Sequence, residues 1–184
     1  MKELSLNILD ITQNSITAKA KNIRITIVED TKENTVCITV KDDGTGMGGE
    51  ALQKVTDPFY TSRTTRKVGL GVPFFKMEAE MTGGSFEIAS ELGSGTRISA
   101  VFRTDSLDSI PLGDIISTLC VLVQGAPETD FYFSHRIDEK TIELNTPELR
   151  EILGDDVSLS EPEVVAWMKE YLTENYHNIS SNNG

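Results

Sequence analysis

The chain has 184 residues, of which 38% are hydrophobic and 25% charged, a composition typical of a globular protein rather than of a disordered or fibrous one. It has only two cysteines and no apolar run of the ~18 residues that a membrane helix needs, so we expect neither a disulfide framework nor a membrane span, and we expect a cytoplasmic protein. The formal net charge of −12 argues against nucleic acid as a partner, because a phosphate backbone requires a basic surface.

The charge is unevenly distributed along the chain. Residues 1–103 contain 13 acidic and 13 basic residues, whereas residues 104–184 contain 16 acidic and four basic residues and carry the whole excess. This shift predicts an N-terminal domain over residues 1–104 and an acidic C-terminal appendage over residues 105–184. The acidic excess either docks a basic protein surface or is simply a solvated exterior.

Residues 3–20 are predicted to form a helix, because apolar or small residues recur there at the spacing of one helical face. These residues are Leu4, Ile8, Ile11, Ser15 and Ala18. Asp10 and Asn14 project together at roughly 80–100° from the centre of this stripe. Two polar side chains one turn apart, at the border of a buried face, either line a pocket or form an exposed polar edge.

Two segments with alternating apolar and polar residues follow, over residues 22–29 and 34–41, and predict an antiparallel hairpin. The second segment runs directly into a glycine-rich loop, Asp42–Gly48. Glycines in such a loop let the backbone come close to a flat ligand, and the carboxylate of Asp43 can accept a hydrogen bond from an exocyclic amine. The alternative is that Asp-Gly is only a turn signal.

A basic stretch extends from Asp57 to Lys76 and contains no acidic residue after Asp57. Its cations are Arg63, Arg66, Lys67 and Lys76. It also contains Gly69-Leu70-Gly71, and Pro73 suits the first turn of a helix. A basic, glycine-containing loop that leads into a helix N-terminus is typical of a phosphate site, because free backbone N–H groups and the helix dipole both attract anions. An ordinary surface loop is the alternative.

The remaining elements of the N-terminal domain complete an alternation of helices and hairpins. They are a helix over residues 49–55, a helix from Gly71 to about Met81, and strands over residues 85–90 and 96–103. We expect Phe74, Met77 and Met81 to face the sheet. This order predicts an α+β fold, a two-layer α/β sandwich in which helices cover one face of a mixed, mainly antiparallel sheet.

The appendage is predicted to be a small α+β unit that packs its own core or lies against the N-terminal sheet. Its segments are residues 112–123 (a helix, or a strand near its end), a hairpin over 131–136 and 141–144, a short helix after Thr146, an amphipathic helix from about Pro162, and a frayed tail over 178–184. It contains no catalytic constellation, and we do not expect phosphorylation of His135 or His177. We therefore expect the appendage to dock a partner or to dimerise.

Together these segments resemble, in order, the four motifs of the ATP-binding domain shared by histidine kinases, anti-sigma-type serine kinases, gyrase and mismatch-repair ATPases and the heat-shock chaperone. The matching segments are residues 10–20 (N box), Asp43–Met47 (first glycine box), residues 58–63 with Gly69–Val72 (F box and second glycine box) and residues 93–96 (last glycine box). The resemblance covers about residues 4–103 and implies a Bergerat fold that binds ATP and Mg²⁺.

The resemblance also implies a role for individual residues. The ATP-binding set would be Asn14, Asp43, Gly46, Met47, Arg63, Arg66, Lys67, Gly69, Leu70, Gly71, Val72 and Thr96. Asn14 would coordinate Mg²⁺, a hard cation that prefers oxygen ligands. Asp43 would accept the adenine amino group with support from Thr96. Arg63 and Lys67 would act catalytically from a lid at the terminal phosphates.

Departures from the family pattern leave the reaction open. Asp10 stands where histidine kinases carry Asn and where hydrolysing members carry Glu as a general base. It is therefore a candidate general base whose side chain is one methylene shorter than that of Glu. Lys67 replaces an expected glycine. No phosphoacceptor helix pair is expected, so we expect a stand-alone domain that acts as a kinase on a separate protein or as an ATP-dependent regulatory subunit. The alternatives are a non-catalytic ATP-sensing module and a hydrolytic ATPase clamp, and the partner is a different protein or a second copy.

Overall fold

A computed structural model describes residues 3–57 and 70–181 of the chain. The helices are α1 (Leu4–Thr17), α2 (Gly49–Val55), α3 (Gly71–Met81), α4 (Ile115–Gly125), α5 (Thr146–Leu153) and α6 (Pro162–Ser181). The strands are β1 (Asn22–Asp30), β2 (Thr35–Asp42), β3 (Ser85–Glu91), β4 (Gly95–Arg103), β5 (Asp130–Ile137) and β6 (Lys140–Asn145). Within these described ranges, no helix is long and apolar enough to cross a membrane.

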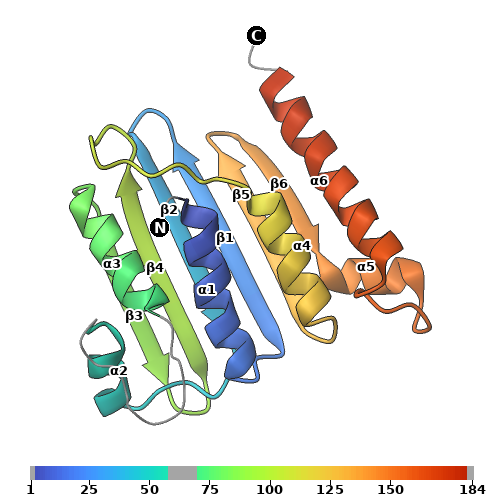
Figure 1. The fold of residues 1–184 in the computed structure, drawn as a ribbon, viewed down its shortest axis with the longest axis horizontal. Coiled ribbons are helices and arrows are strands. Elements are labelled where there is room, and N and C mark those ends of the chain that lie inside the picture. Colours follow the sequence, from blue (N-terminus) through green and yellow to red (C-terminus); the bar gives the residue numbers. More distant parts are fainter. Residues whose placement is uncertain (1–2, 58–69, 182–184) are drawn as a thin grey trace.

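The strands form one six-stranded sheet in the order β3-β4-β2-β1-β5-β6 (Figure 1). All neighbouring strands are antiparallel except β1 and β5, which run parallel with Ile25 opposite Phe133. The sheet is therefore mixed and mainly antiparallel, which confirms the predicted fold class. Strands β5 and β6 continue the N-terminal sheet beside β1, so residues 105–184 neither form a separate core nor simply lie against that sheet.

Helices α1, α3 and α4 lie side by side over one face of this sheet (Figure 1). The inward side chains of β1, which include Ile23, Ile25 and Ile27, are fully buried beneath them. Burial of such a side chain contributes about 1.5–3 kcal/mol each. The same hydrophobic core includes Phe133 of β5 and Leu172 of α6, so both parts of the chain share one core. The division of the chain into domains at residue 104 stays a prediction.

Helix α1 lies between α3 and α4, and both of its flanks are therefore held. Its buried face contains Leu4, Ile8, Ile11 and Ser15, as predicted. At its start, the backbone N–H groups of Leu4 and Ser5 donate hydrogen bonds of 2.9 and 2.8 Å to the carbonyl oxygens of Pro111 and Leu112. The segment before α4 thus fixes the position of the helix that carries Asp10 and Asn14.

The buried face of helix α3 differs from the predicted one. Val72, Phe75 and Ala79 are buried, whereas Met77 and Met81 are 46% and 55% exposed. The prediction was wrong because apolar residues occur all around this helix, and aromatic packing selects among them. The ring of Phe75 lies 5.2 Å from that of Phe102 and 6.4 Å from that of Phe86, measured between centroids.

The C-terminal helix α6 continues to Ser181, so the prediction of a frayed tail was wrong for residues 178–181. Ile179 packs against the core, and its carbonyl oxygen accepts a hydrogen bond of 3.4 Å from Lys140. The helix is also tied to the sheet through buried His135, whose Nδ1 lies 2.7 Å from the hydroxyl of Tyr176 and whose Nε2 lies 2.8 Å from Glu29. Burial raises the pKa of Tyr176.

Candidate functional site

The motif residues converge where β2 ends beside helix α1, and Asp42 is the buried acidic group there. Val36, Ile38 and Val40 point toward the helices, and the alternation of the strand places Asp42 on the same face. Asp42 is 8% exposed. Its Oδ2 accepts a hydrogen bond of 2.6 Å from the hydroxyl of Ser15, and its Oδ1 accepts one of 2.9 Å from the N–H of Gly44.

Asp42 is a candidate site residue that was not predicted from the sequence. The signal that identifies it is the same alternation that predicted the strand, since every second residue from Val36 onward faces the helices. Motif matching selected the neighbouring Asp43 instead, because two aspartates precede the glycine loop.

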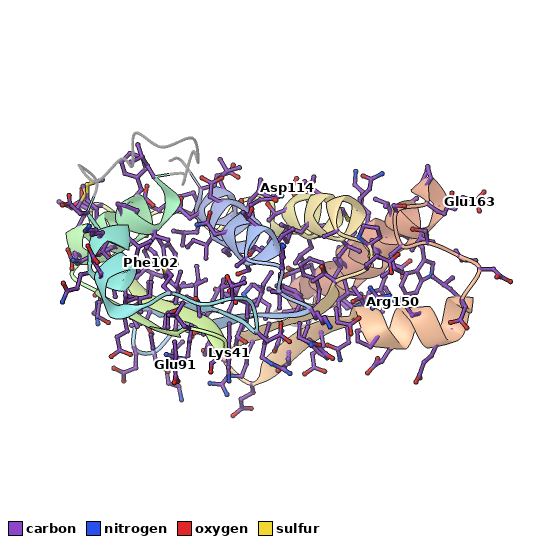
Figure 2. The ribbon with its side chains drawn as sticks, turned by 90° about the horizontal axis from the view of Figure 1, so that it is seen from below. Lys41, Glu91, Phe102, Asp114, Arg150 and Glu163 are labelled. Atoms are coloured by element: carbon purple, nitrogen blue, oxygen red, sulfur yellow. The ribbon has the colours of Figure 1, made fainter. Side chains whose placement is uncertain are left out.

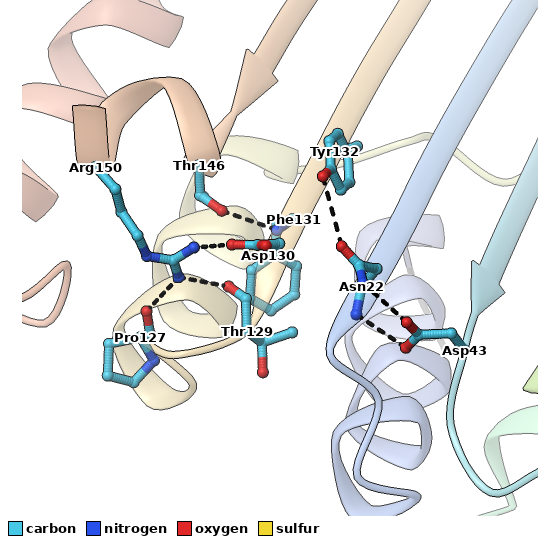
Figure 3. A network of polar contacts seen from close by, with 9 residues as sticks. All are labelled: Asn22, Asp43, Pro127, Thr129, Asp130, Phe131, Tyr132, Thr146 and Arg150. Carbon is cyan, nitrogen blue, oxygen red and sulfur yellow. Dashed lines mark hydrogen bonds and ion pairs between the residues drawn. The ribbon is translucent and has the colours of Figure 1, made fainter. Parts of the chain in front are cut away.

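Asp43 directly follows β2, and its carboxylate points toward Asn22 at the start of β1 (Figure 3). Its Oδ1 accepts hydrogen bonds of 2.8 and 2.9 Å from the backbone N–H groups of Lys21 and Asn22, and its Oδ2 accepts one of 2.8 Å from the Asn22 side chain. Although desolvation raises the pKa of Asp43, these hydrogen bonds outweigh it and lower the pKa below its ordinary value. Both oxygens of the predicted adenine acceptor are therefore engaged in closing β1 onto the end of β2.

The glycine loop after Asp42 packs directly on the β3–β4 turn. Gly46 has a φ of +69°, and a Cβ atom there would lie 1.9 Å from the carbonyl oxygen of Glu91, so only glycine fits. The N–H of Met47 donates a hydrogen bond of 2.8 Å to the hydroxyl of Ser90, which lies 2.7 Å from the hydroxyl of Thr96. Thr96 is opposite Asp42 in the register of β2 and β4, so the two share the helix face. The predicted Gly46, Met47 and Thr96 are thus brought together beside Asp42.

Asp10 and Asn14 lie one turn apart on the flank of α1 that faces α3. The N-terminus of α3 is in direct contact with this flank, since a Cβ atom at Gly71 would lie 2.9 Å from that of Asp10. Partial burial raises the pKa of Asp10 above its ordinary value. The first-turn N–H groups of α3, including those of Gly71 and Val72, have no acceptor within the helix. They can therefore bind an anion beside Asp10.

A buried polar contact joins α1 to α3 further along the same flank. The amide nitrogen of Asn7 donates a hydrogen bond to Glu78, and the two side chains are 0% and 6% exposed. Within residues 3–57 and 70–181, the Oδ1 atom of Asn7 has no hydrogen-bond partner. A polar contact in the core is expensive unless its geometry is kept, so this pair fixes how α3 approaches Asp10.

The predicted lid lies outside the described residues. Arg63, Arg66 and Lys67 belong to it, and Gly69 of the second glycine box is also outside the described residues, so their proposed contacts with phosphate stay predictions. Leu70 precedes α3 as its N-terminal capping residue and is 41% exposed. The second glycine box therefore enters the described structure at the helix start, where the sequence predicted it.

Comparison with known proteins identifies relatives of this chain. Residues 1–106 match the family described as "Histidine kinase-, DNA gyrase B-, and HSP90-like ATPase". The sensor protein SrrB of Staphylococcus aureus (strain NCTC 8325 / PS 47) is 40% identical over 101 residues, which are 52% of this chain and 17% of that protein. The chain thus spans about a sixth of the length of the curated relatives that it matches.

Solved structures with the same fold include two that cover most of the chain. The Aquifex aeolicus MutL ATPase domain complexed with ADP has a TM-score of 0.51 and 17% sequence identity, covering 83% of this chain and 69% of that one. The N-terminal domain of a DNA repair protein also has a TM-score of 0.51, with 13% identity, covering 79% of this chain and 53% of that one. At these identities, the likeness establishes the fold alone.

Proposed function

The chain belongs to the family of histidine kinase-, DNA gyrase B- and HSP90-like ATPases, and from this premise we propose that it is a Mg-ATP-dependent kinase that acts on a separate protein. Membership of the family implies ATP binding, and the likeness to a sensor protein supports a role in signalling. The observation that carries the proposal is the buried hydrogen bond from Ser15 to Asp42. It holds the purine end of the site against the helix whose Asp10 and Asn14 belong to the phosphate end.

Asp42, in place of Asp43, is our candidate for the acceptor of the adenine amino group. An ionised carboxylate has room for about four hydrogen bonds, and Ser15 and Gly44 donate one each. The carboxylate of Asp42 can therefore accept further hydrogen bonds, on the helix-covered face of the sheet beside Thr96. Gly46 supports this site indirectly, because the lack of a side chain lets the glycine loop pack against the carbonyl oxygen of Glu91 in the β3–β4 turn.

The residues at the other end of the site fit a polyphosphate and its cation. Asn14 offers an amide oxygen, which suits Mg²⁺, and the N-terminus of α3 offers N–H groups and the positive end of its dipole. Bound Mg²⁺ would supply charge neutralisation at the phosphates. Arg63, Arg66 and Lys67 of the lid would add cations from the segment outside the described residues.

Asp10 is the candidate base. Its raised pKa brings it nearer to the range in which a carboxylate exchanges protons near neutral pH. In the proposed reaction, Asp10 takes the proton of the acceptor group on the partner protein. The contact between Gly71 and Asp10 would keep that carboxylate beside the N-terminus of α3.

The experiment that tests the proposal follows the γ-phosphate. The protein and its natural partner are isolated together and incubated with γ-labelled ATP, alongside Asn14→Ala and Asp10→Asn. We expect label on the partner from the wild type, and a rate about 10²–10⁴-fold lower from Asp10→Asn. Label that appears only as inorganic phosphate would instead identify a hydrolytic ATPase. Tight binding of ATP without any transfer would identify an ATP-sensing module.

We propose that residues 105–184 dock that partner or a second copy of the chain. Their excess of acidic residues supports it, since 16 of the 29 acidic residues of the chain occur there. Sedimentation of the full chain alone and with its partner distinguishes the two occupants.

A further inference from the structure

The face of the sheet opposite the helices carries an unbroken row of cations. Arg97 of β4 is directly opposite Lys41 of β2, and Lys41 is directly opposite Arg24 of β1. All three side chains are exposed. Figure 2 shows Lys41 on the side of the sheet away from α1, α3 and α4. The row continues with Tyr132 of β5, over whose ring the guanidinium of Arg24 lies at 4.8 Å from the centroid.

This row is unfavourable for the fold itself. Like charges directly opposite each other on neighbouring strands destabilise a sheet, and Lys41 has such a neighbour on both sides. None of the three cations forms an ion pair within residues 3–57 and 70–181, although Glu87 and Glu91 lie diagonally from Arg97 on β3. In a chain of net charge −12, a surface that costs stability is explained more simply by a ligand than by the fold.

The row next to these cations on the same face is polar. The next row of residues across the sheet consists of Glu87, Ser99, Thr39, Thr26, Ser134 and Glu143. Its four central residues are small and carry hydroxyl groups, so a partner can approach the backbone closely and find hydrogen-bonding groups. Such a surface suits a charged, reversible contact rather than a large apolar interface.

We propose that the row formed by Arg24, Lys41 and Arg97 binds a helix of a partner protein that carries a stripe of carboxylates. Strands are about 4.8 Å apart, so three neighbouring cations span about 10 Å. Carboxylates at positions i, i+4 and i+7 of a helix span about 10.5 Å on one face. A helix laid across the strands therefore places one carboxylate near each cation. This surface is on the opposite side of the sheet from Asp42 and α1, so the inference does not rest on the proposed kinase activity.

Lys41→Glu of the full chain tests the proposal through two readouts of opposite sign. The new carboxylate lies between Arg24 and Arg97, so we expect the Tm to rise by about 2–4 °C. The probes are two fluorescein-labelled, alanine-rich helical peptides of equal composition, one with glutamates at i, i+4 and i+7 and one with the same glutamates distributed around the helix. The wild type is expected to bind the striped peptide about fivefold more tightly than the scattered one, and Lys41→Glu is expected to lose this preference.

Matched variants distinguish an effect of the Lys41 position from an effect of the changed net charge. Lys169→Glu makes the same charge change on α6 and is expected to keep the preference for the striped peptide, as is the charge-conserving Lys41→Arg. Equal binding of the two peptides to the wild type, or a lower Tm in Lys41→Glu, would overturn the proposal. So would tighter binding of a labelled oligothymidylate to the same face, or a dimer of the wild type that Lys41→Glu dissociates, since these would identify a nucleic acid or a second copy as the occupant.

Discussion

The hydroxyl of Ser15 donates a hydrogen bond of 2.6 Å to Oδ2 of Asp42, and both residues are buried. This contact joins the end of β2 to the helix that carries Asp10 and Asn14. A hydrogen bond to an ionised carboxylate is about twice as strong as one between neutral groups. The two halves of the proposed nucleotide site are therefore joined by one buried pair.

Ser15→Ala removes the donor and leaves a buried carboxylate with one hydrogen bond fewer. We expect the free energy of unfolding to fall by about 1–3 kcal/mol, as measured by urea denaturation. Gln13→Ala, on the exposed side of the same helix, is the control and should change stability by no more than about 0.5 kcal/mol. Equal effects of the two substitutions would show that the Ser15–Asp42 contact contributes little.

Asn14→Ala is predicted to remove the effect of magnesium on ATP binding. The wild type should bind ATP more tightly with Mg²⁺ than with a chelator, because the amide oxygen and the phosphates share the cation. In the variant we expect that gain to shrink by about tenfold or more. Titration calorimetry with and without Mg²⁺ measures it. A gain that is unchanged in Asn14→Ala would contradict the assignment of this residue as the metal ligand.

Asp10→Asn is predicted to stabilise the protein at neutral pH. The pKa of Asp10 is raised in the folded state, because partial burial disfavours the ionised form. The folded state therefore loses stability as the pH rises from the ordinary pKa of Asp10 through the raised one. The asparagine avoids this loss, so its advantage should be present above the raised pKa and shrink as the pH falls through it.

Urea denaturation at several pH values tests this sign. Asp105→Asn provides the opposite case, because the hydrogen bond from Arg103 lowers the pKa of Asp105. The ionised carboxylate of Asp105 stabilises the folded state at pH values above its ordinary pKa. This stabilisation is lost as the pH falls through the lowered pKa. A stability gain in Asp10→Asn that is independent of pH would point to packing instead of ionisation.

Gly46→Ala is predicted to disrupt the glycine loop. The new Cβ atom would lie 1.9 Å from the carbonyl oxygen of Glu91, in a residue with a φ of +69°. We expect a loss of about 2 kcal/mol or more in the free energy of unfolding, together with weaker ATP binding. Gly49→Ala is the matched control, since a Cβ atom at that position would have no atom of the described residues within 4 Å. Comparable thermal stability of the two variants would contradict the account of the loop.

Local patterns in the sequence predicted most elements of the fold. The alternation of residues 34–41 located β2, and the stripe of Leu4, Ile8 and Ile11 located the buried face of α1. The parallel pairing of β1 with β5 could not be predicted this way. It joins segments more than 100 residues apart, and the acidic composition of the C-terminal part suggested a separate unit. Alternation says which face of a strand is buried but not which strand lies beside it.

The sequence identified the segments that meet at the candidate site, whereas the role of each individual residue there stays a prediction. Asp10 and Asn14 were identified because helical geometry places residues four apart on one flank. The choice between Asp42 and Asp43 required the alternation of β2 to be extended two residues beyond Val40, the last apolar residue of the strand. In α3, aromatic neighbours from β3 and β4 selected Phe75 over Phe74, and that selection is a property of the packed core.

Calorimetric titration of Mg-ATP into the wild type, Asp42→Asn and Asp43→Asn tests the central assignment most directly. We predict that Asp42→Asn lowers the affinity by about 10- to 100-fold, because a buried hydrogen bond to a charged group is lost. Asp43→Asn should stay within about threefold of the wild type, because its carboxylate binds Lys21 and Asn22. Full affinity in Asp42→Asn, with loss in Asp43→Asn, would contradict the account.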